Sequence, residues 1–204
     1  MSGLSLAARL ARAEPGSKVL FVCLETCTLS FRDDRMQKAD IIATVLFGDG
    51  AAAACLSTEG ESQASIGRGV EHTWTDTLAI MGWDVDEKGF GVIFDRSIPE
   101  FVKTEFAQAV ATGLAAMNLA EDEVTRLVCH PGGAKVVEAI EGALHLPSES
   151  LDHERGVLRD FGNMSAPTAL FVLERVLKDR PNGPLVMAAL GPGFTASLLE
   201  IDAK

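Results

Sequence analysis

Two strand-like stretches that are apolar on both faces constrain the fold more than any other feature of the chain. Residues 18–24 (KVLFVCL) and 124–129 (VTRLVC) lack the strict alternation of a strand with one face in water. A strand that is apolar on both faces needs cover on both sides of its sheet, and helices usually provide that cover. We therefore expect a sheet with helices packed against it.

The remaining pattern alternates helical and strand-like segments. Residues 26–40 are polar and irregular, Pro99 opens a long amphipathic helix, and a glycine-rich turn at 191–193 joins two closing strands. Helix crossovers are thus mixed with hairpins, which predicts an α/β layered domain with a mixed sheet. The expected helices are 4–13, 41–46, 99–117, 131–144, 152–160 and 166–177, and the expected strands are 18–24, 51–56, 64–77, 89–94, 124–129, 185–190 and 195–201.

Composition excludes several classes of function. The chain has 204 residues, which predicts one domain, and a net charge of -11, which repels phosphate backbones and anionic lipid. We therefore expect no nucleic-acid partner and no membrane partner. No apolar run is long enough to span a bilayer, and the N-terminus does not resemble a signal peptide. The four cysteines show no metal-binding spacing, which favours reduced cysteines in a cytoplasmic protein.

His130 is the first candidate for chemistry. It ends the strand at 124–129 and precedes a helix that is opened by a proline and two glycines. Ligand groups gather at the carboxyl ends of strands in α/β sheets, and the positive end of the following helix disfavours a charged imidazolium. The position predicts a neutral imidazole that can donate one N–H to an oxyanion. The alternative is a histidine that only packs at a strand end.

Asn163 offers a second donor. It follows Gly162 and precedes a helix with Pro167 in its first turn. An asparagine in this setting commonly caps the helix, but its side-chain amide can also donate to an oxyanion. Two neutral donors on one oxygen would stabilise an enolate or a tetrahedral intermediate. The spacing does not show whether Asn163 and His130 converge.

Four motifs occur in a fixed order: LFGDGAAA at 46–53, CHPGGAK at 129–135, GNMSAPT at 162–168 and LGPGFT at 190–195. Together they resemble type III polyketide synthases of the chalcone and stilbene synthase family. That family's HPGG and GNMSS signatures match 130–133 and 162–165, with Ala166 in place of the second serine. Its GFGPG loop matches 189–193, with Leu190 where phenylalanine is usual. The MGWD sequence at 81–84 is similar to the bacterial branch, and the resemblance covers essentially the whole chain.

The resemblance implies a thiolase-like fold, of which this chain would be the C-terminal half, a mixed five-stranded sheet covered by helices. Residues 1–204 would form the C-terminal chalcone/stilbene synthase-like domain, in which 1–60 are the tail of the N-terminal half. The implied activity is acyl transfer by decarboxylative Claisen condensation of malonyl-CoA onto an acyl-CoA starter, in a homodimer. CoA thioesters would be the substrates, and neither a metal nor another cofactor is implied.

The resemblance also assigns roles to residues. His130 and Asn163 would hold the thioester oxygen while malonyl-CoA loses CO₂, and His130 would also support the nucleophilic thiolate. The residues that would shape the substrate pocket are Cys27, Ser30, Phe47, Phe94, Leu190, Gly191, Pro192 and Gly193, and those that would contact CoA are Gly132, Gly133 and Lys135. Without the resemblance, Phe47 and Phe94 would be interpreted as core residues and Lys135 as a solvated side chain.

The chain departs from the family at the nucleophile. The family places a Gly-Cys pair at the start of a buried helix that precedes the strand at 18–24, so that cysteine would lie a few residues before Met1. Cys27 follows that strand, where the family has a pocket wall. Cys129 neighbours His130 in a strand and therefore points to the opposite face. We expect that the chain alone makes no polyketide.

Three alternatives stay open. A 3-oxoacyl-ACP synthase III shares the fold, but it would carry His-Gln-Ala-Asn at 130–133, where this chain has HPGG. The chain would otherwise be a truncated, inactive remnant, or a subunit completed by a separately encoded N-terminal half. In either case an apolar surface would lie uncovered, which predicts self-association.

Overall fold

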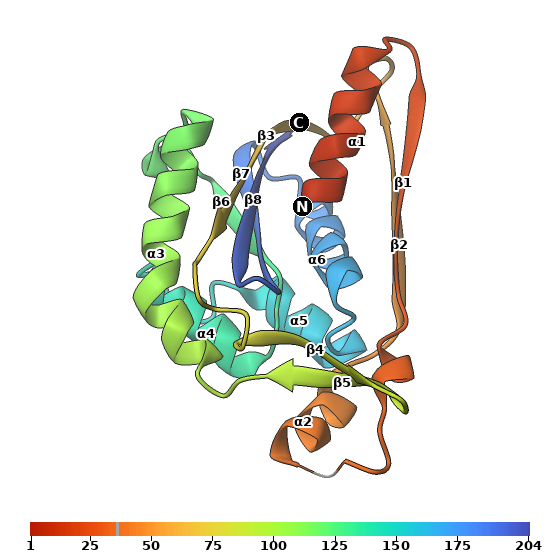
Figure 1. The fold of residues 1–204 in the computed structure, drawn as a ribbon. Helices are drawn as coiled ribbons and strands as arrows, with labels where there is room; N and C mark the ends of the chain where they lie inside the picture. Colours follow the sequence, from red (N-terminus) through yellow and green to blue (C-terminus); the bar gives the residue numbers. More distant parts are fainter. Residues whose placement is uncertain (36) are drawn as a thin grey trace.

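The computed structural model describes residues 1–35 and 37–204, and a mixed sheet lies at its centre (Figure 1). The strands β3 (Ala64–Thr73), β6 (Arg126–Cys129), β7 (Gly183–Gly191) and β8 (Thr195–Ala203) pair in the order β3-β8-β7-β6. β6 runs parallel to β7, and the other two pairs are antiparallel. The mixed sheet is as predicted. The implied count of five strands was wrong for the described residues, because the strands formed from 18–25 and 50–57 pair only with each other.

Helices cover both faces of this sheet. α3 (Ile98–Met117) and α4 (Ala134–Ala143) pack on one face, and α1 (Ser2–Ala13), α5 (Asp152–Phe161) and α6 (Ala166–Lys178) lie on the other (Figure 1). The short strand β6 shows why two apolar faces were needed. Cys129 joins the core on the α3 side, and its neighbour Val128 joins the core on the α6 side. Alternate side chains of one strand therefore support two separate cores.

A second hairpin forms an outer layer. β1 (Lys18–Glu25) and β2 (Gly50–Ser57) are antiparallel and lie across α1 and α6, on the side away from the central sheet (Figure 1). Their inward side chains, such as Phe21, pack on the core. The outward Leu20, Val22 and Leu24 are 66%, 58% and 67% exposed. The expected cover on both faces of 18–24 is thus present on one face only within the described part of the chain.

A third hairpin closes one end of the molecule. β4 (Met81–Asp86) and β5 (Gly89–Phe94) form a two-stranded sheet beside α2 (Lys38–Leu46) and the 3₁₀ turn η1 (Cys27–Ser30) (Figure 1). The expected strand at 64–77 ends earlier, at Thr73, where the chain turns toward this hairpin. A second 3₁₀ turn, η2 (Glu121–Glu123), links α3 to β6. Among the described residues, no helix has the length and apolar character needed to cross a membrane.

Local sequence explains where the helices begin and end. Pro99 stands in the first turn of α3, and Asn118 ends that helix in the left-handed conformation, with φ of 59°. Pro167 stands in the first turn of α6. A proline is tolerated at these positions because the first N–H groups of a helix have no helical partner. These signals fix where α6 begins, directly after the GNMS motif.

Candidate active site

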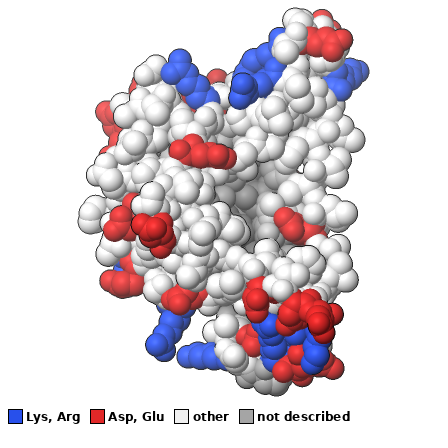
Figure 2. Space-filling view, in the orientation of Figure 1, with Lys and Arg blue, Asp and Glu red and all other residues white. Residues whose placement is uncertain are grey.

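A cavity of about 580 Å³ lies between the β4–β5 hairpin, the start of α6 and the carboxyl end of the central sheet. Figure 2 shows a hollow in the middle of one face, surrounded mainly by uncharged side chains. His130 and Asn163, the two predicted donors, both line the cavity. The structure therefore brings together two residues that are 33 positions apart in sequence and come from different elements.

His130 directly follows β6. Its backbone N–H donates to the carbonyl oxygen of Ala188 across 2.8 Å, which extends the pairing with β7 by one residue and fixes the start of the HPGG loop. Burial lowers the pKa of His130 to about 4, so its imidazole is neutral at pH 7. A neutral imidazole carries one N–H donor and one acceptor nitrogen. It can donate to a developing negative charge without holding a positive charge of its own.

The side-chain amide of Asn163 is held in one orientation. Its Nδ2 donates to the carbonyl oxygen of Gly132 across 3.1 Å, and its Oδ1 accepts the backbone N–H of Ser165 across 2.8 Å. A flipped amide would place like groups against each other at both contacts, so the hydrogen bonds select this orientation. The second hydrogen on Nδ2 has no partner among the described residues. It is the donor that a ligand in the cavity can use.

Phe47 is tied to Asn163 through the backbone. The carbonyl of Leu46 accepts the Asn163 N–H across 2.9 Å, and the Gly48 N–H donates to the Asn163 carbonyl across 3.0 Å. Gly162 makes this approach possible, since it adopts φ of +71° and a Cβ there would lie 2.8 Å from the Leu46 carbonyl oxygen. The link between α2 and β2 is thereby fixed to the start of α6.

Two aromatic rings predicted to shape the pocket meet in the cavity wall. Phe47 and Phe94 contact each other edge to face, with ring centroids 6.3 Å apart, and both line the cavity. Such a pair holds two rings from different elements in a defined angle. The cavity is therefore bounded by aromatic rings next to the asparagine donor.

The other predicted site residues divide into two groups. Cys27, Gly132, Leu190, Gly191 and Pro192 line the cavity, whereas Ser30, Gly133, Lys135 and Gly193 are not among its lining residues. The hydroxyl of Ser30 donates to the Cys27 carbonyl across 2.6 Å and closes η1. Lys135 is exposed at the start of α4, and Gly133 precedes that helix in an extended conformation. Gly193 adopts φ of +137°, and a Cβ there would lie 2.6 Å from Thr195 Oγ1.

Neither the Cys27 thiol nor the Cys129 thiol is activated. Burial raises the pKa of Cys27, and the nearby Glu25 and Asp49 carboxylates raise it further. Burial raises the pKa of Cys129 well above its usual value, and this side chain lies in the core rather than in the cavity wall. Both thiols therefore keep their protons at pH 7. In residues 1–35 and 37–204, no three His, Cys, Asp or Glu side chains are arranged to hold a metal ion.

Glu154 supports the site in a way that sequence reasoning missed. It is fully buried on α5, and its Oε1 accepts the backbone N–H of Cys129 across 2.9 Å. β6 is an edge strand, so this N–H points away from β7 and needs another acceptor. Arg126 lies 3.4 Å from the second carboxylate oxygen, and burial raises the pKa of Glu154. One sequence signal could have indicated its burial. Glu154 stands three residues before the buried Val157, which places both on the same face of the helix.

Asp49 is the second supporting residue that was missed. Its carboxylate accepts the backbone N–H of Thr28 across 2.8 Å and the Thr28 hydroxyl across 2.7 Å. These bonds, the backbone one first, lower the pKa of Asp49. They fix η1, and with it Cys27, against the start of β2. The sequence signal was an aspartate between two glycines, which indicates a turn but not its distant partner.

Family models match nearly the whole chain. The model described as "Chalcone and stilbene synthases, C-terminal domain" matches residues 71–200, and the model described as "Chalcone and stilbene synthases, N-terminal domain" matches residues 1–60. His130 and Asn163 lie in the first of these matches. Phe47 and Cys27 lie in the second. The cavity is thus built from parts of both matched segments.

Curated relatives cover the chain almost from end to end. A 1,3,6,8-tetrahydroxynaphthalene synthase from Streptomyces peucetius subsp. caesius is 34% identical over 193 residues, covering 91% of this chain and 51% of the relative. A 3,5-dihydroxyphenylacetyl-CoA synthase from Amycolatopsis balhimycina is 31% identical over 210 residues, covering 99% of this chain and 56% of the relative. The chain therefore spans about half the length of the curated relatives it matches.

Solved structures share the fold. The 1,3,6,8-tetrahydroxynaphthalene synthase of Streptomyces coelicolor A3(2), described as a bacterial type III polyketide synthase, superposes with a TM-score of 0.92 at 21% identity, over 100% of this chain and 59% of that one. The type III polyketide synthase domain of Steely1 from Dictyostelium superposes with a TM-score of 0.88 at 24% identity, over 99% and 58%. The fold is therefore the thiolase-like fold that the sequence motifs implied. With both family models matched along its length, the chain belongs to the chalcone and stilbene synthase family of type III polyketide synthases.

Proposed function

We propose that this chain supplies the oxyanion-stabilising part of a type III polyketide synthase, an acyltransferase that condenses malonyl-CoA onto an acyl-CoA starter. The observation that carries the proposal is the placement of a neutral His130 and an oriented Asn163 amide on one largely uncharged cavity. Both are donors without a positive charge, and both lie in the segment that the C-terminal family model matches. CoA thioesters are the proposed substrates, and the proposed reaction needs no metal or redox cofactor.

Charge development explains why two neutral donors suit this reaction. When malonyl-CoA loses CO₂, the bonding electron pair moves into the thioester and the carbonyl oxygen becomes an enolate oxygen. The N–H groups of His130 and Asn163 then hold that oxygen, and they bind the enolate more strongly than the starting carbonyl. In the next step the enolate carbon bonds to the acyl carbon of a cysteine thioester, and the thiolate leaves. The same donors stabilise the oxygen until the new C–C bond forms.

We place the nucleophilic thiolate outside this chain. Cys27 lines the cavity, but its pKa is raised, and Cys129 is buried away from the cavity. The chain also spans about half the length of its curated relatives. The proposed activity therefore belongs to an assembly of this chain with an N-terminal half of the family, and the chain alone makes no polyketide.

The outward face of β1 and β2 supports a partnered state. Leu20, Val22 and Leu24 stand exposed in one row, opposite Cys55, Ala53 and Ala51 of β2. An apolar strip of this kind is a site of association in soluble proteins. We propose that this chain pairs through the strip with a second polypeptide, and with its own copy as a homodimer when no other partner is present.

Decarboxylation separates the oxyanion role from the nucleophile. The intact chain would be mixed with a separately expressed N-terminal segment of the Streptomyces peucetius relative, and ¹⁴CO₂ release from labelled malonyl-CoA would be measured together with product formation. His130→Ala and Asn163→Ala should each slow CO₂ release by about 10²-fold, the usual effect of losing one oxyanion donor. His153→Ala and Asn182→Ala, which lie outside the cavity lining, are the matched controls.

The outcomes of this assay are distinct. Loss of activity in both cavity variants, with normal activity in both controls, supports the proposed donors. Equal CO₂ release by the original chain and the Asn163→Ala variant would show that the amide is not a donor. Condensation products from the chain alone that disappear in Cys27→Ser would overturn the placement of the thiolate.

A further inference from the structure

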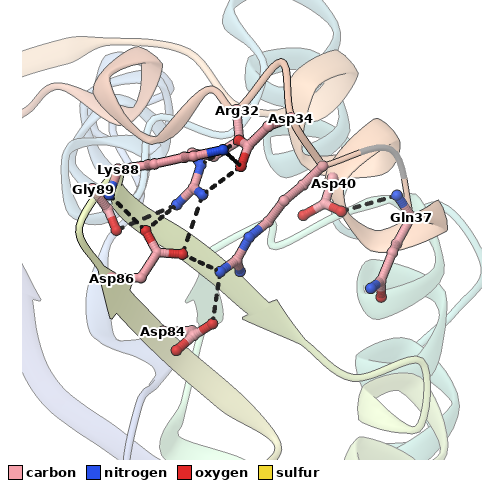
Figure 3. A network of polar contacts seen from close by, with 9 residues as sticks. Arg32, Asp34, Gln37, Asp40, Asp84, Asp86, Lys88 and Gly89 are labelled. Carbon is pink, nitrogen blue, oxygen red and sulfur yellow. Dashed lines mark hydrogen bonds and ion pairs between the residues drawn. The ribbon is translucent and has the colours of Figure 1, made fainter.

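A cluster of six charged side chains lies beside the cavity and ties the β4–β5 hairpin to the loop after η1 (Figure 3). We call it the hairpin clamp, and its members are Arg32, Asp34, Arg35, Asp84, Asp86 and Lys88. In Figure 2 the charged atoms at the lower right interleave both signs. With three basic and three acidic members, the clamp is neutral as a group. Its charged groups pair with one another.

Arg32 joins the two segments. Its guanidinium binds Asp34 through Nε at 2.7 Å and Nη2 at 2.9 Å, and Asp86 of β4 through Nη1 at 2.9 Å and Nη2 at 3.2 Å. Nη1 also approaches the carbonyl of Gly89 at 3.4 Å. The Arg32 side chain is only 6% exposed. Paired, two-pronged contacts to a buried guanidinium are the strong kind of ion pair, and they fix geometry as well as attract.

Arg35 adds a second tie across the face of the hairpin. Its Nη2 contacts Asp84 at 2.9 Å and Asp86 at 2.7 Å. Gly91 of β5 is paired with Asp84 in the hairpin register, and a Cβ on Gly91 would collide with Nη1 of Arg35. The guanidinium thus lies over a position of β5 that has no side chain. A Cβ there would displace the end of the Arg35 side chain from its present position, so the glycine leaves room for the clamp although glycine weakens a strand.

The hairpin depends on such ties. Within residues 1–35 and 37–204, β4 and β5 pair only with each other, and two-stranded hairpins are marginally stable on their own. Trp83 and Phe90 are 50% and 52% exposed, so little of the hairpin is buried in the core. The hairpin nevertheless supplies cavity-lining residues, among them Trp83 and Phe94, while Cys27 of η1 lines the same cavity. The clamp therefore joins two segments that carry parts of one cavity wall.

We propose that the hairpin clamp is a positioning element that fixes the β4–β5 wall of the cavity and thereby limits the size of the acyl chain it accepts. The limit on acyl size rests on the proposed function. The rigidity of the wall does not, and it can be measured in the intact chain without any synthase reaction.

Hydrogen exchange followed by mass spectrometry tests the wall directly. In Arg32→Gln, the amides of residues 81–94 should exchange about tenfold faster than in the original chain, since a buried two-pronged ion pair is lost. Arg159→Gln is the matched control, because it removes an exposed ion pair with Asp160 on α5. Unchanged exchange at 81–94 in Arg32→Gln would overturn the proposal. Faster exchange over the whole chain would also overturn it, because the arginine would then serve overall stability only.

A pair of substitutions separates positioning from simple packing. Gly91→Ala should speed exchange at 81–94 although alanine favours a strand over glycine, because its methyl group displaces Arg35. In an Arg35→Gln background the same substitution should have little further effect. Gly82→Ala, where a Cβ meets only the Leu78 carbonyl at 3.9 Å, is the control. Additive effects of Gly91→Ala and Arg35→Gln would contradict the contact on which the clamp is built.

The proposed limit on acyl-chain size is measured in the assembled enzyme. With the N-terminal segment present, Arg32→Gln should raise kcat/KM for a long acyl-CoA starter relative to a short one, with Arg159→Gln unchanged. If the original assembly forms no product, the proposed function fails, while the exchange data still decide whether the clamp holds the wall. An unchanged ratio between long and short starters, in an active assembly with faster exchange at 81–94, would overturn the size limit.

Discussion

The side-chain amide of Asn163 donates to the carbonyl oxygen of Gly132 across 3.1 Å. This one bond joins the HPGG loop after β6 to the GNMS segment before α6. It places the asparagine amide beside the histidine loop without using the whole amide, because the second Nδ2 hydrogen remains for a ligand. The predicted cap role was wrong, because α6 has its N-cap at Ser165 and makes no side-chain cap hydrogen bond. Oδ1 holds the Ser165 N–H at the helix start, and Nδ2 faces the HPGG loop.

Asn163→Asp tests whether this bond orients the site. A carboxylate oxygen would replace the Nδ2 donor and would face the Gly132 carbonyl oxygen, so two acceptors would meet without a proton. The free energy of unfolding should fall by about 1–3 kcal/mol, the effect of leaving a buried polar group unpaired. Urea unfolding of the intact chain measures it, and Asn182→Asp at an exposed position is the control. Equal stability of Asn163→Asp and the original chain would contradict the assigned amide orientation.

The pKa of His130 predicts a pH dependence of stability. Burial lowers the pKa from 6.5 to about 4, so between these values the unfolded chain binds a proton that the folded chain does not. Stability contributed by His130 is therefore present above pH 6.5 and is lost as pH falls toward 4. His130→Gln should lose less stability than the original chain between pH 7 and pH 5, as measured by urea unfolding at both values.

NMR titration gives the direct check of the same group. The His130 ring signals should move with a midpoint near pH 4. A His130 midpoint at or above 6.5 would mean that the imidazole is charged under mildly acidic conditions. The proposed neutral donor would then be wrong.

The predicted parts of the fold rested on local signals. Pro99 and Pro167 placed two helix starts, and the buried strand before His130 was predicted within two residues of its start. The separate β1–β2 layer could not be predicted, because apolar patterning shows that a strand is buried but not which strand it pairs with. The exposure of Leu20 and Val22 could not be predicted for the same reason.

Some residues of the candidate site could also be predicted from local sequence, and others could not. His130 and Asn163 stood in motifs with a local chemical reason, and the structure places both on one cavity. Glu154 acts only because β6 is an edge strand, and strand order is a property of the whole sheet. Arg32 lies in the polar stretch 26–40, where the sequence shows a charge but not its partner Asp86, 54 positions away. Contacts between distant polar residues carry no periodic signal.

Glu154 can be tested with two substitutions. Glu154→Gln keeps an oxygen acceptor for the Cys129 N–H and removes a buried charge, so stability at pH 7 should be equal or higher. Glu154→Leu removes the acceptor and should lower the free energy of unfolding by about 1–3 kcal/mol. Thermal or urea unfolding provides the comparison. If the His130 ring signals shift in Glu154→Leu but not in Glu154→Gln, the HPGG loop has moved.

The same residue predicts a pH trend of the opposite sign to that of His130. Burial raises the pKa of Glu154, so the folded chain binds a proton at pH values where the unfolded chain has released it. The stability that Glu154 contributes falls as the pH rises above 4.5, the ordinary pKa of a glutamate. Glu154→Gln should remove that trend. A steeper loss of stability with rising pH in Glu154→Gln than in the original chain would contradict this account.

The exposed row on β1 predicts that the chain associates with itself in solution. Leu20, Val22 and Leu24 are each more than half exposed and form one apolar strip with the facing side of β2. Burying such surface is favourable by about 25 cal/mol per Å², whereas the repulsion from a net charge of -11 is screened within roughly 8–10 Å at physiological salt. Burial should therefore prevail. A twofold pairing would use the same strip on both copies.

Sedimentation at micromolar concentration and moderate salt measures this association. The original chain should sediment as a dimer or larger species, and Val22→Lys should shift it toward the monomer, because a lysine in the centre of the strip would have to be buried on both copies. Val45→Lys, at an apolar position of α2 that is 83% exposed, is the matched control and should leave the association unchanged. A single folded species of 21.6 kDa for the original chain would show that the strip is not an interface between copies of this chain. An equal shift in both lysine variants would instead attribute any association to general exposed apolar surface.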